Sequence, residues 1–335
     1  MNVPRTRRSR FSGNPVSPQE GHRPVLLHES IQSLEIHKDD TVLDATVGGA
    51  GHAHEIVRLL GPRGTFIGFD LDADAIERAK TALADARCGI ELILANFRDL
   101  HRELERRGIK TITKALFDLG WSSYQLDSGR GFSLKSDEPL VMTYAKEGAA
   151  VTARTVLNDW SEETLADIIY GFGEERYSRR IAKAIVEYRA RRTIETAREL
   201  AEIIYEAVPV GYRHGKIHPA TRTFQALRIA VNDELGALSQ GIRAAYELLE
   251  EGGRIAVISF HSIEDRAVKQ LFAQLEADGK GMRVTKKPIS AGAAERTANR
   301  RARSAKLRVF EKQSTYDKKT SKNKQIQTLH TAGEI

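Results

Sequence analysis

The stretch from residue 41 to residue 60 constrains the fold of this chain more than any other. The sequence predicts a short buried strand over residues 41–45, a glycine-rich loop over 46–51, and a helix over 53–60 whose apolar residues recur at i, i+3, i+4 and i+7. Elements in that order present free backbone N–H groups and the positive end of a helix dipole to an anionic ligand group. The stretch therefore predicts a nucleotide-type cofactor site.

The spacing of the glycines narrows the choice of cofactor. A dinucleotide site requires Gly-x-Gly-x-x-Gly, but Gly49 and Gly51 are followed by His52, Ala53 and His54, so the third glycine is missing. A phosphate-binding P-loop is excluded because no Gly-Lys-Ser/Thr follows. What remains is the looser loop used for S-adenosylmethionine, with a structural tight turn or a degenerate nucleotide site as open alternatives.

Strand and helix patterns alternate after this loop, with strands predicted at residues 65–70, 90–95 and 115–118. The alternation stops after Gly120, and sheet patterns resume only at residues 253–260. The residues between carry helical patterns, including a long helical region over 218–251. We therefore expect a mostly parallel α/β sheet with an all-helical domain inserted after its fourth strand. A helix over 262–277 and strands near 283–287 and 306–311 are expected to complete the sheet.

Positive charge is concentrated at the two ends of the chain. Residues 1–19 contain four arginines and no acid, and residues 296–335 contain eleven lysines or arginines against three acids, in a chain of net charge +7. Basic ends favour contact with a polyanion such as RNA, because phosphate neutralisation supplies sequence-independent affinity. Ends that are merely solvated are the alternative. We expect a flexible basic arm over residues 1–20 and a basic disordered tail over 313–335.

Residue types also limit the compartment and the metal chemistry. The single cysteine, Cys88, excludes a disulfide framework and a cysteine-based zinc site, and is typical of a reducing compartment. No apolar run approaches the ~18 residues of a membrane span, so we expect a cytoplasmic protein with no membrane partner. His52 and His54 would point in different directions on a helix, and His214 and His218 lie in an interrupted loop, so no metal is expected.

Ligands of an open α/β sheet bind at the carboxyl ends of its strands. Asp70 ends the second predicted strand and is expected to accept both ribose hydroxyls of an adenosine, with a helix N-cap as the alternative. Phe97, after the third strand, is placed to cover an adenine face or to join the core. Asp118 ends the fourth strand and precedes Trp121, whose ring would stack on a flipped base or pack at the domain junction.

Cys88 also bears on the reaction. Methylation of carbon 5 of a pyrimidine needs a thiolate to attack carbon 6, and Cys88 lies away from every predicted strand end. Methylation of an exocyclic amine or a hydroxyl needs only in-line placement against the sulfonium and an acceptor for the departing proton. The sequence therefore favours direct N- or O-methylation without a covalent enzyme intermediate, and His261, ending the fifth strand, is a candidate for substrate contact.

Blocks of residues along the chain resemble the bacterial RsmH (MraW) family, and they run in order from residue 22 to about residue 310. The blocks are His22-x-Pro24-Val25-Leu26-Leu27, Asp44-x-Thr46-x-Gly48-Gly49-x-Gly51-His52, Asp118-Leu119-Gly120-Trp121-Ser122-Ser123-x-Gln125-Leu126-Asp127, Arg130-Gly131-Phe132-Ser133, Gly173-Glu174-Glu175-Arg176, His218-Pro219-Ala220-Thr221-Arg222-Thr223-Phe224-Gln225-Ala226-Leu227-Arg228, Ser259-Phe260-His261-Ser262-x-Glu264-Asp265-Arg266 and Arg301-Ala302-Arg303-Ser304-Ala305-Lys306-Leu307-Arg308.

The resemblance implies a Rossmann-like class I methyltransferase that uses S-adenosyl-L-methionine to methylate N4 of a cytidine in 16S ribosomal RNA. The substrate would lie in the decoding region of the small ribosomal subunit. The implied domains are a methyltransferase domain over 21–134 and 218–312 and a helical substrate-recognition domain over 135–217. The expected cofactor contacts are Gly49, Ala50, Gly51, His52, Asp70, Phe97, Asp118 and Gln125.

The resemblance leaves the catalytic residue and the oligomeric state open. Asp118 and His261 are the candidates for the catalytic residue, and a homodimer is one of the open states. The substrate candidates are Trp121, Ser122, Arg176, Arg222 and His261. Arg176 begins a basic row that could follow an RNA backbone, although a solvated helix face is its usual meaning.

The chain departs from the family pattern at one place. The family usually has Asp-Gly-Pro-Leu-Asp-Met-Arg-Met where residues 137–144 are Asp-Glu-Pro-Leu-Val-Met-Thr-Tyr, so Val141 and Thr143 replace an acid and an arginine. This keeps two other functions in view. One is methylation of a small molecule or a protein, and the other is a ribosome-assembly factor that binds the cofactor without turnover. A dehydrogenase comes last, because the third glycine is absent.

Overall fold

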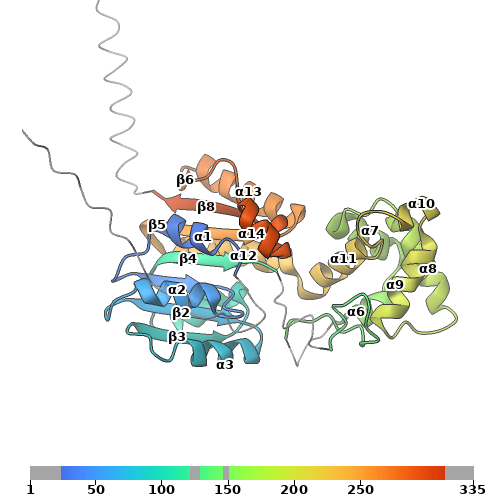
Figure 1. The fold of residues 1–335 in the computed structure, drawn as a ribbon, viewed down its shortest axis with the longest axis horizontal. Coiled ribbons are helices and arrows are strands. Elements are labelled where there is room, and N and C mark those ends of the chain that lie inside the picture. Colours follow the sequence, from blue (N-terminus) through green and yellow to red (C-terminus); the bar gives the residue numbers. More distant parts are fainter. Residues whose placement is uncertain (1–23, 121–128, 146–150, 314–335) are drawn as a thin grey trace, which may run out of the picture.

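The computed structural model describes residues 24–120, 129–145 and 151–313 of the 335-residue chain. Figure 1 shows a twisted sheet flanked by helices and, beside it, a separate group of helices. Trp121, Ser122 and Gln125 lie outside the described residues, as do the whole N-terminal arm and nearly all of the C-terminal tail.

Eight strands form one sheet with the order β3-β2-β1-β4-β5-β8-β6, and β7 pairs with β8. The strands are β1 (Thr41–Asp44), β2 (Thr65–Asp70), β3 (Gly89–Leu94), β4 (Ile112–Asp118), β5 (Leu249–Ser259), β6 (Gly281–Arg283), β7 (Ile289–Ser290) and β8 (Lys306–Lys312). The first five strands in this order are parallel, and β8 is antiparallel to β5. Strand order reverses at β1, which pairs with both β2 and β4, so the ligand crevice is expected at the carboxyl end of β1.

Helices cover both faces of the sheet, as right-handed crossovers require. The helices of this part are α1 (Leu27–Leu34), α2 (Gly51–Leu59), α3 (Ala73–Ala82), α4 (Leu100–Glu105), α12 (Glu234–Leu248), α13 (Ser262–Ala277) and α14 (Ala293–Ala298), with short 3-10 turns η1 (Phe97–Asp99) and η2 (Arg300–Arg303). One core lies on the α2 and α3 face of the sheet, and a second core packs α12 and α13 against the other face. The expected Rossmann-like α/β fold is confirmed.

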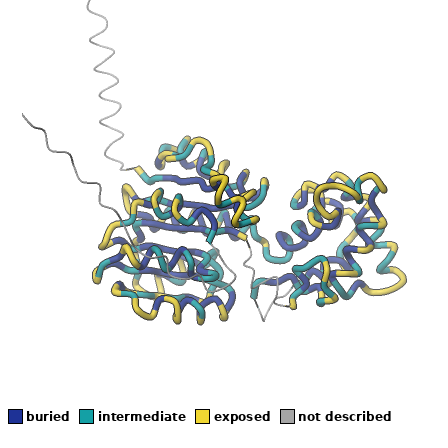
Figure 2. Tube along the Cα trace, in the orientation of Figure 1, coloured by how far each residue is buried: buried dark blue, intermediate teal, exposed yellow. Residues whose placement is uncertain are grey.

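The separate helices share a third core of their own. They are α6 (Ala153–Asp159), α7 (Glu162–Gly173), α8 (Ser178–Arg189), α9 (Ala197–Ala207), α10 (Val210–Arg213) and α11 (Thr221–Asn232). Buried side chains of this core run from Leu140 to Leu227, so α11 packs with the helical group although it leads back to the sheet. Figure 2 shows the buried residues of the two parts as separate interiors.

Two expectations for the later elements need correction. The long helical region at 218–251 is broken at Asp233, whose φ of 46° ends α11 and starts α12 in a new direction. The strand expected at 283–287 was wrong, since β6 is Gly281–Arg283 and β7 follows at Ile289–Ser290. Residues 284–288 separate the two segments, and Pro288, just before β7, lacks the N–H that a strand ladder needs.

No helix in the described parts of the chain combines the length and the apolar character that crossing a bilayer would need.

Gly68 in β2 permits a close approach that a side chain would prevent. A Cβ at this position would lie 2.5 Å from Val47 Cγ2 and 2.9 Å from Leu92 Cδ2. Gly68→Ala is therefore expected to lower the free energy of unfolding by about 1–3 kcal/mol through overpacking, measured by urea denaturation. Gly89→Ala is the matched control, because its nearest neighbour, Thr65 Oγ1, is 3.5 Å away. Equal losses in both variants would contradict the steric explanation.

Candidate functional site

The loop after β1 is built by backbone geometry. Gly48 and Ala50 have positive φ angles of 51° and 59°, which turn the chain from the strand into α2. A Cβ at Gly51, the first residue of α2, would lie 2.9 Å from Pro24 Cγ, so a glycine is required for Pro24 to pack on the loop. The loop thus stays open and low in bulk at the strand end, as the sequence predicted.

Asp70 ties this loop to the end of β2. Its Oδ2 accepts a hydrogen bond from the Gly48 N–H at 2.8 Å, and its Oδ1 accepts one from the Asp72 N–H at 2.9 Å. Burial raises the pKa of Asp70, and these two backbone hydrogen bonds oppose the rise. The helix N-cap is Asp72, which accepts from the Asp74 N–H, so the N-cap alternative for Asp70 falls away. Each carboxylate oxygen keeps a lone pair for a further donor such as a hydroxyl.

A cavity lies where these strand ends meet. Its wall includes most of the expected cofactor residues, namely Gly49, Gly51, His52, Asp70, Phe97 and Asp118. Ala50 is buried beneath the loop and is not among the described residues of the wall. Phe97 lines the cavity and also packs edge-on against Phe117, at 5.6 Å between ring centroids, so its position is compatible with both alternatives.

Asp118 and His52 face each other beneath this cavity. His52 Nδ1 lies 3.5 Å from Asp118 Oδ2, while His52 Nε2 lies 3.2 Å from the Val25 carbonyl oxygen. Burial is the main cause that raises the pKa of Asp118 to about 8, and the charge of Arg301 opposes it. Asp118 Oδ1 is buried and has no hydrogen-bond partner among the described residues. An acceptor oxygen in the cavity wall without a donor is suited to an N–H group of a ligand.

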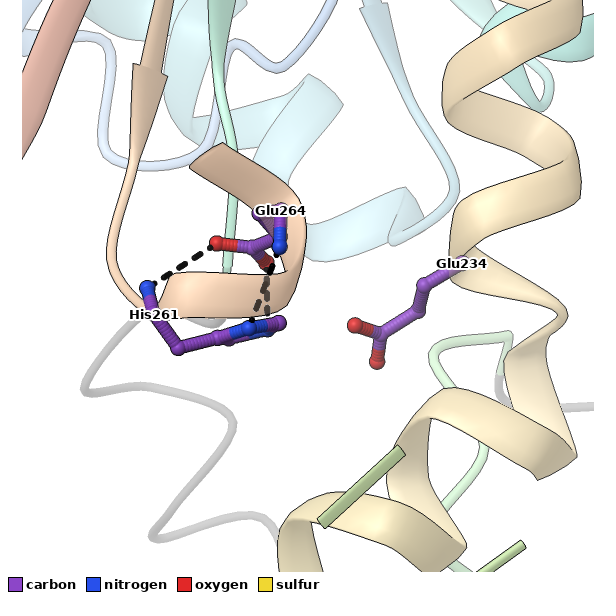
Figure 3. A group of neighbouring side chains, drawn as sticks. All are labelled: Glu234, His261 and Glu264. Atoms are coloured by element: carbon purple, nitrogen blue, oxygen red, sulfur yellow. Dashed lines mark hydrogen bonds and ion pairs between the residues drawn. The ribbon is translucent and has the colours of Figure 1, made fainter. Parts of the chain in front are cut away.

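A buried ion cluster lies next to the cavity. The Arg228 guanidinium donates to both carboxylate oxygens of Glu234, at 2.7 and 2.9 Å, and lies 3.8 Å from Glu264 Oε1. His261 begins α13 as its cap, with Nδ1 accepting from the Glu264 N–H at 3.3 Å and Nε2 lying 2.9 Å from Glu264 Oε1. Figure 3 shows His261 and Glu264 bonded at the start of α13, with Glu234 opposite them.

Glu234, His261 and Glu264 offer ligand atoms within 4.8 Å of one another, a spacing that a metal ion could use. Arg228, however, already supplies a positive charge to both carboxylates. Burial works to lower the pKa of Arg228, but Glu234, Tyr144 and Glu264 raise it above its ordinary value. The cluster is therefore balanced by an arginine as it stands.

The segment that departs from the family pattern joins the same cluster. The Tyr144 hydroxyl donates to Glu234 Oε1 at 2.8 Å, and the Tyr144 N–H donates to Asn232 Oδ1 at 2.9 Å. Arg130 donates to the carbonyl oxygens of Thr143 and Tyr144. Tyr144 also lines the first cavity, so this segment forms part of its wall.

A second cavity of about 490 Å³ opens beside the first, between the sheet and the helical part. Gly120 and Arg301 line both cavities. The other described lining residues include aromatic side chains, the candidate His261, and several residues of α11: Phe132, Phe260, His261, Thr221, Phe224, Gln225 and Arg228. The sequence reasoning missed Arg301, although this residue opens the last block of the family resemblance.

Arg176 and Arg222 lie elsewhere in the helical part and are not among the described residues that line either cavity. The Arg176 guanidinium stacks over the rings of Tyr177 and Tyr212, at 4.8 and 5.0 Å from their centroids. Arg222 donates to the Glu174 carbonyl oxygen at 3.2 Å. Any contact of these two arginines with a substrate would thus be outside the cavities.

Asp44 gives a pH-dependent stability that can be measured. Burial raises the pKa of Asp44 from 3.8 to about 7. Between these values the folded state binds more protons than the unfolded state, so the free energy of unfolding falls as pH rises from 4 to 7. Asp44→Asn is expected to lose less stability than the wild type between pH 5 and pH 8 in urea titrations. Asp85→Asn, at an exposed residue, is the control. If the free energy of unfolding changed equally with pH in Asp44→Asn and Asp85→Asn, the raised pKa of Asp44 would be contradicted.

The chain is similar to known proteins over most of its length. A family model described as the MraW methylase family matches residues 19–313. The chain is 44% identical to ribosomal RNA small subunit methyltransferase H of Symbiobacterium thermophilum, over 87% of this chain and 96% of that protein. It is 43% identical to the protein of the same name from Clostridioides difficile, over 87% and 98%.

Solved structures include an rRNA methylase from Streptococcus thermophilus, 12% identical, with a TM-score of 0.42, covering 87% of this chain and 98% of that one. The resemblance noted in the sequence is confirmed by the family match, which spans most of the chain. This protein belongs to the MraW methylase family.

Proposed function

We propose that this protein transfers a methyl group from S-adenosyl-L-methionine to N4 of a cytidine in the 16S rRNA of the small ribosomal subunit, in its decoding region. Relatives at 43–44% identity are named as methyltransferases of small-subunit ribosomal RNA, which supports this substrate. The observation that carries the proposal is Asp118, whose buried Oδ1 in the wall of the cofactor cavity lacks a donor among the described residues. With a ribosomal substrate, we place the protein in the cytoplasm.

The cavity residues suit S-adenosylmethionine. Asp70 has lone pairs left for the ribose hydroxyls, Phe97 offers a ring to the adenine, and the narrow loop at Gly49 and Gly51 leaves room for the methionine end. Gln125 is retained as a proposed contact, although it lies outside the described residues. When bound, the cofactor supplies an electrophilic methyl group on a sulfonium.

Direct transfer is supported by the position of Cys88. This buried residue immediately precedes β3 and is not among the described residues that line either cavity. Burial also raises the pKa of its thiol, which lowers the fraction of thiolate. A covalent route through a pyrimidine carbon needs a thiolate beside the base. An exocyclic amine needs only orientation and a proton acceptor.

Asp118 is the better candidate for that acceptor. The two ring nitrogens of His261 already contact Glu264, at 3.3 and 2.9 Å. Asp118 has an oxygen left over and lines the cofactor cavity. We assign His261 to holding the start of α13 and to substrate contact, and Asp118 to accepting the hydrogen of the amine.

The helical part is proposed as the element that recognises the ribosomal RNA. We place its limits at residues 135–217 together with the α11 side chains that share its core. The exposed Arg176 and the neighbouring Arg222 supply positive charge on this part, and Trp121 and Ser122 remain proposed contacts to the base. A salt bridge at 2.7 Å between Glu174 and Arg266 of α13 connects the helical part to the methyltransferase part.

Incubation with small subunits that lack the modification tests the function. Labelled cofactor should give label in N4-methylcytidine after digestion of the rRNA to nucleosides. Label in a small molecule or a protein, with activity indifferent to RNA and salt, would indicate the methyltransferase alternative. Cofactor binding by calorimetry without any labelled nucleoside would indicate an assembly factor. No label in any cytidine derivative would reject the proposal.

Asp118→Asn tests the proton acceptor. Loss of the acceptor should lower kcat about 10²–10⁴-fold. The wild-type rate should rise with pH between 6 and 9, because burial raises the pKa of Asp118 to about 8 and only the ionised form accepts a proton. The variant should lose that rise. Asp44→Asn, the same change at the neighbouring strand end, is the control: it should keep the rise but move it to lower pH, because the charge of Asp44 raises the pKa of Asp118.

A further inference from the structure

We propose that the second cavity holds the target pyrimidine nucleotide, and that Arg301, in the wall between the two cavities, makes the site select cytosine over uracil. The inference rests on the proposed function, because it assigns the acceptor side of the same transfer. It adds a nucleotide site and a specificity residue to that function.

The second cavity lies against the cofactor cavity. Methyl transfer requires the reacting atoms to approach within about 3–3.5 Å, so the acceptor must lie against the cofactor cavity. Gly120 and Arg301 line both cavities, whereas the third cavity, near Lys38 and Arg58, shares no described lining residue with the cofactor cavity. A volume of about 490 Å³ is within the range of about 300–1,000 Å³ for ligand pockets.

The wall of the second cavity suits a flat ring. Phe132, Phe224 and Phe260 line it, and aromatic side chains commonly hold an extruded base by stacking. The Arg301 guanidinium lies 5.7 Å from the centroid of the Phe260 ring. Gly120 has a φ of 101°, and a Cβ there would lie 3.2 Å from Phe260 Cδ2, so a glycine is needed where the two cavities meet.

Two polar groups next to the junction of the cavities match one pyrimidine: Arg301 lines both cavities, and Asp118 lines the cofactor cavity beside it. Arginine can only donate hydrogen bonds, and an ionised aspartate can only accept them. Cytosine presents a donor, the N4 amine, beside the acceptors N3 and O2, so Asp118 and Arg301 would face complementary groups. Uracil has the acceptor O4 where cytosine has the N4 donor, and the donor N3–H where cytosine has the N3 acceptor. Bound uracil would therefore leave the buried Asp118 carboxylate facing an oxygen. Such mismatches discriminate strongly when the polar groups of the site are buried.

Arg301 also acts on Asp118 electrostatically. Its positive charge lowers the pKa of Asp118, which burial, Asp44 and Glu264 raise. His52 Nδ1 lies 3.5 Å from Asp118 Oδ2. Asn299 positions Arg301 by accepting its backbone N–H at 3.1 Å at the start of η2. Arg303 lies in the same short helix but is exposed and lines neither cavity among the described residues. Arg303 is therefore a matched control.

The test compares Arg301→Gln, Arg301→Lys and Arg303→Gln with the wild type. Methylation is measured with undermethylated small subunits, and subunits carrying uridine at the target position serve as competitive inhibitors. Arg301→Gln should raise KM for the cytidine subunits about tenfold and leave inhibition by the uridine subunits unchanged, so that discrimination is lost. The pH profile of Arg301→Gln should move to higher pH, and Arg301→Lys should restore it. Cofactor affinity by calorimetry should stay at the wild-type value.

The inference would be overturned if Arg301→Gln discriminated between cytidine and uridine subunits as well as Arg303→Gln does and had the same pH profile. A loss of cofactor affinity in Arg301→Gln as large as the rise in KM would also overturn it, because Arg301 would then be a cofactor contact. Thermal melting of each variant separates these results from misfolding, and Arg301→Lys keeps the test decisive if the glutamine variant unfolds. Failure of the proposed function gives a different result from failure of this inference, because the wild type itself would then methylate no cytidine.

Discussion

The arrangement of the whole molecule depends on one buried guanidinium. Arg228 at the end of α11 binds Glu234 at the start of α12 and lies near Glu264 at the start of α13, while the Tyr144 hydroxyl binds the same Glu234. These contacts join the helical part to both the sheet and the cavity wall. Removal of one partner from a buried pair leaves an uncompensated charge and costs about 3–5 kcal/mol. The position of one part relative to the other is thus specified by charge pairing rather than by apolar packing alone.

Carboxyl groups in this part of the structure differ in the direction of their pKa shifts. Burial raises the pKa of Asp44 and Asp118, so protons are held at the strand ends. In Glu264, burial acts in the same direction, but bonding to His261 and the charge of Arg228 bring its pKa below the ordinary value. Carboxyl groups close to one another therefore differ in ionisation because of their partners, a pattern typical of sites that handle protons.

Much of the fold and part of the site could be predicted from the sequence. Asp70 and Asp118 were predicted because parallel strands bring their carboxyl ends to one edge of the sheet, and strand ends are visible as local patterns. Arg228, Glu234 and Tyr144 were not predicted as a cluster, since their contact depends on the turn at Asp233, where a residue other than glycine adopts a positive φ. The local pattern continued as a helix through that position. Arg301 was missed because a residue beyond the helical region gives no local sign of which cavity it reaches.

Residues from both ends of the described chain meet at the cofactor cavity. The cofactor cavity is lined by Pro24 near the beginning and by Arg301 near the end, and the Leu26 N–H donates to Glu295 at 2.8 Å. The final strand, β8, lies between β5 and β6, so the sheet is incomplete until it has been made. The helical part, which has its own core, emerges earlier. The cavity wall and the sheet therefore need residues from both ends of the described chain, Pro24 and the segment that contains Arg301 and β8.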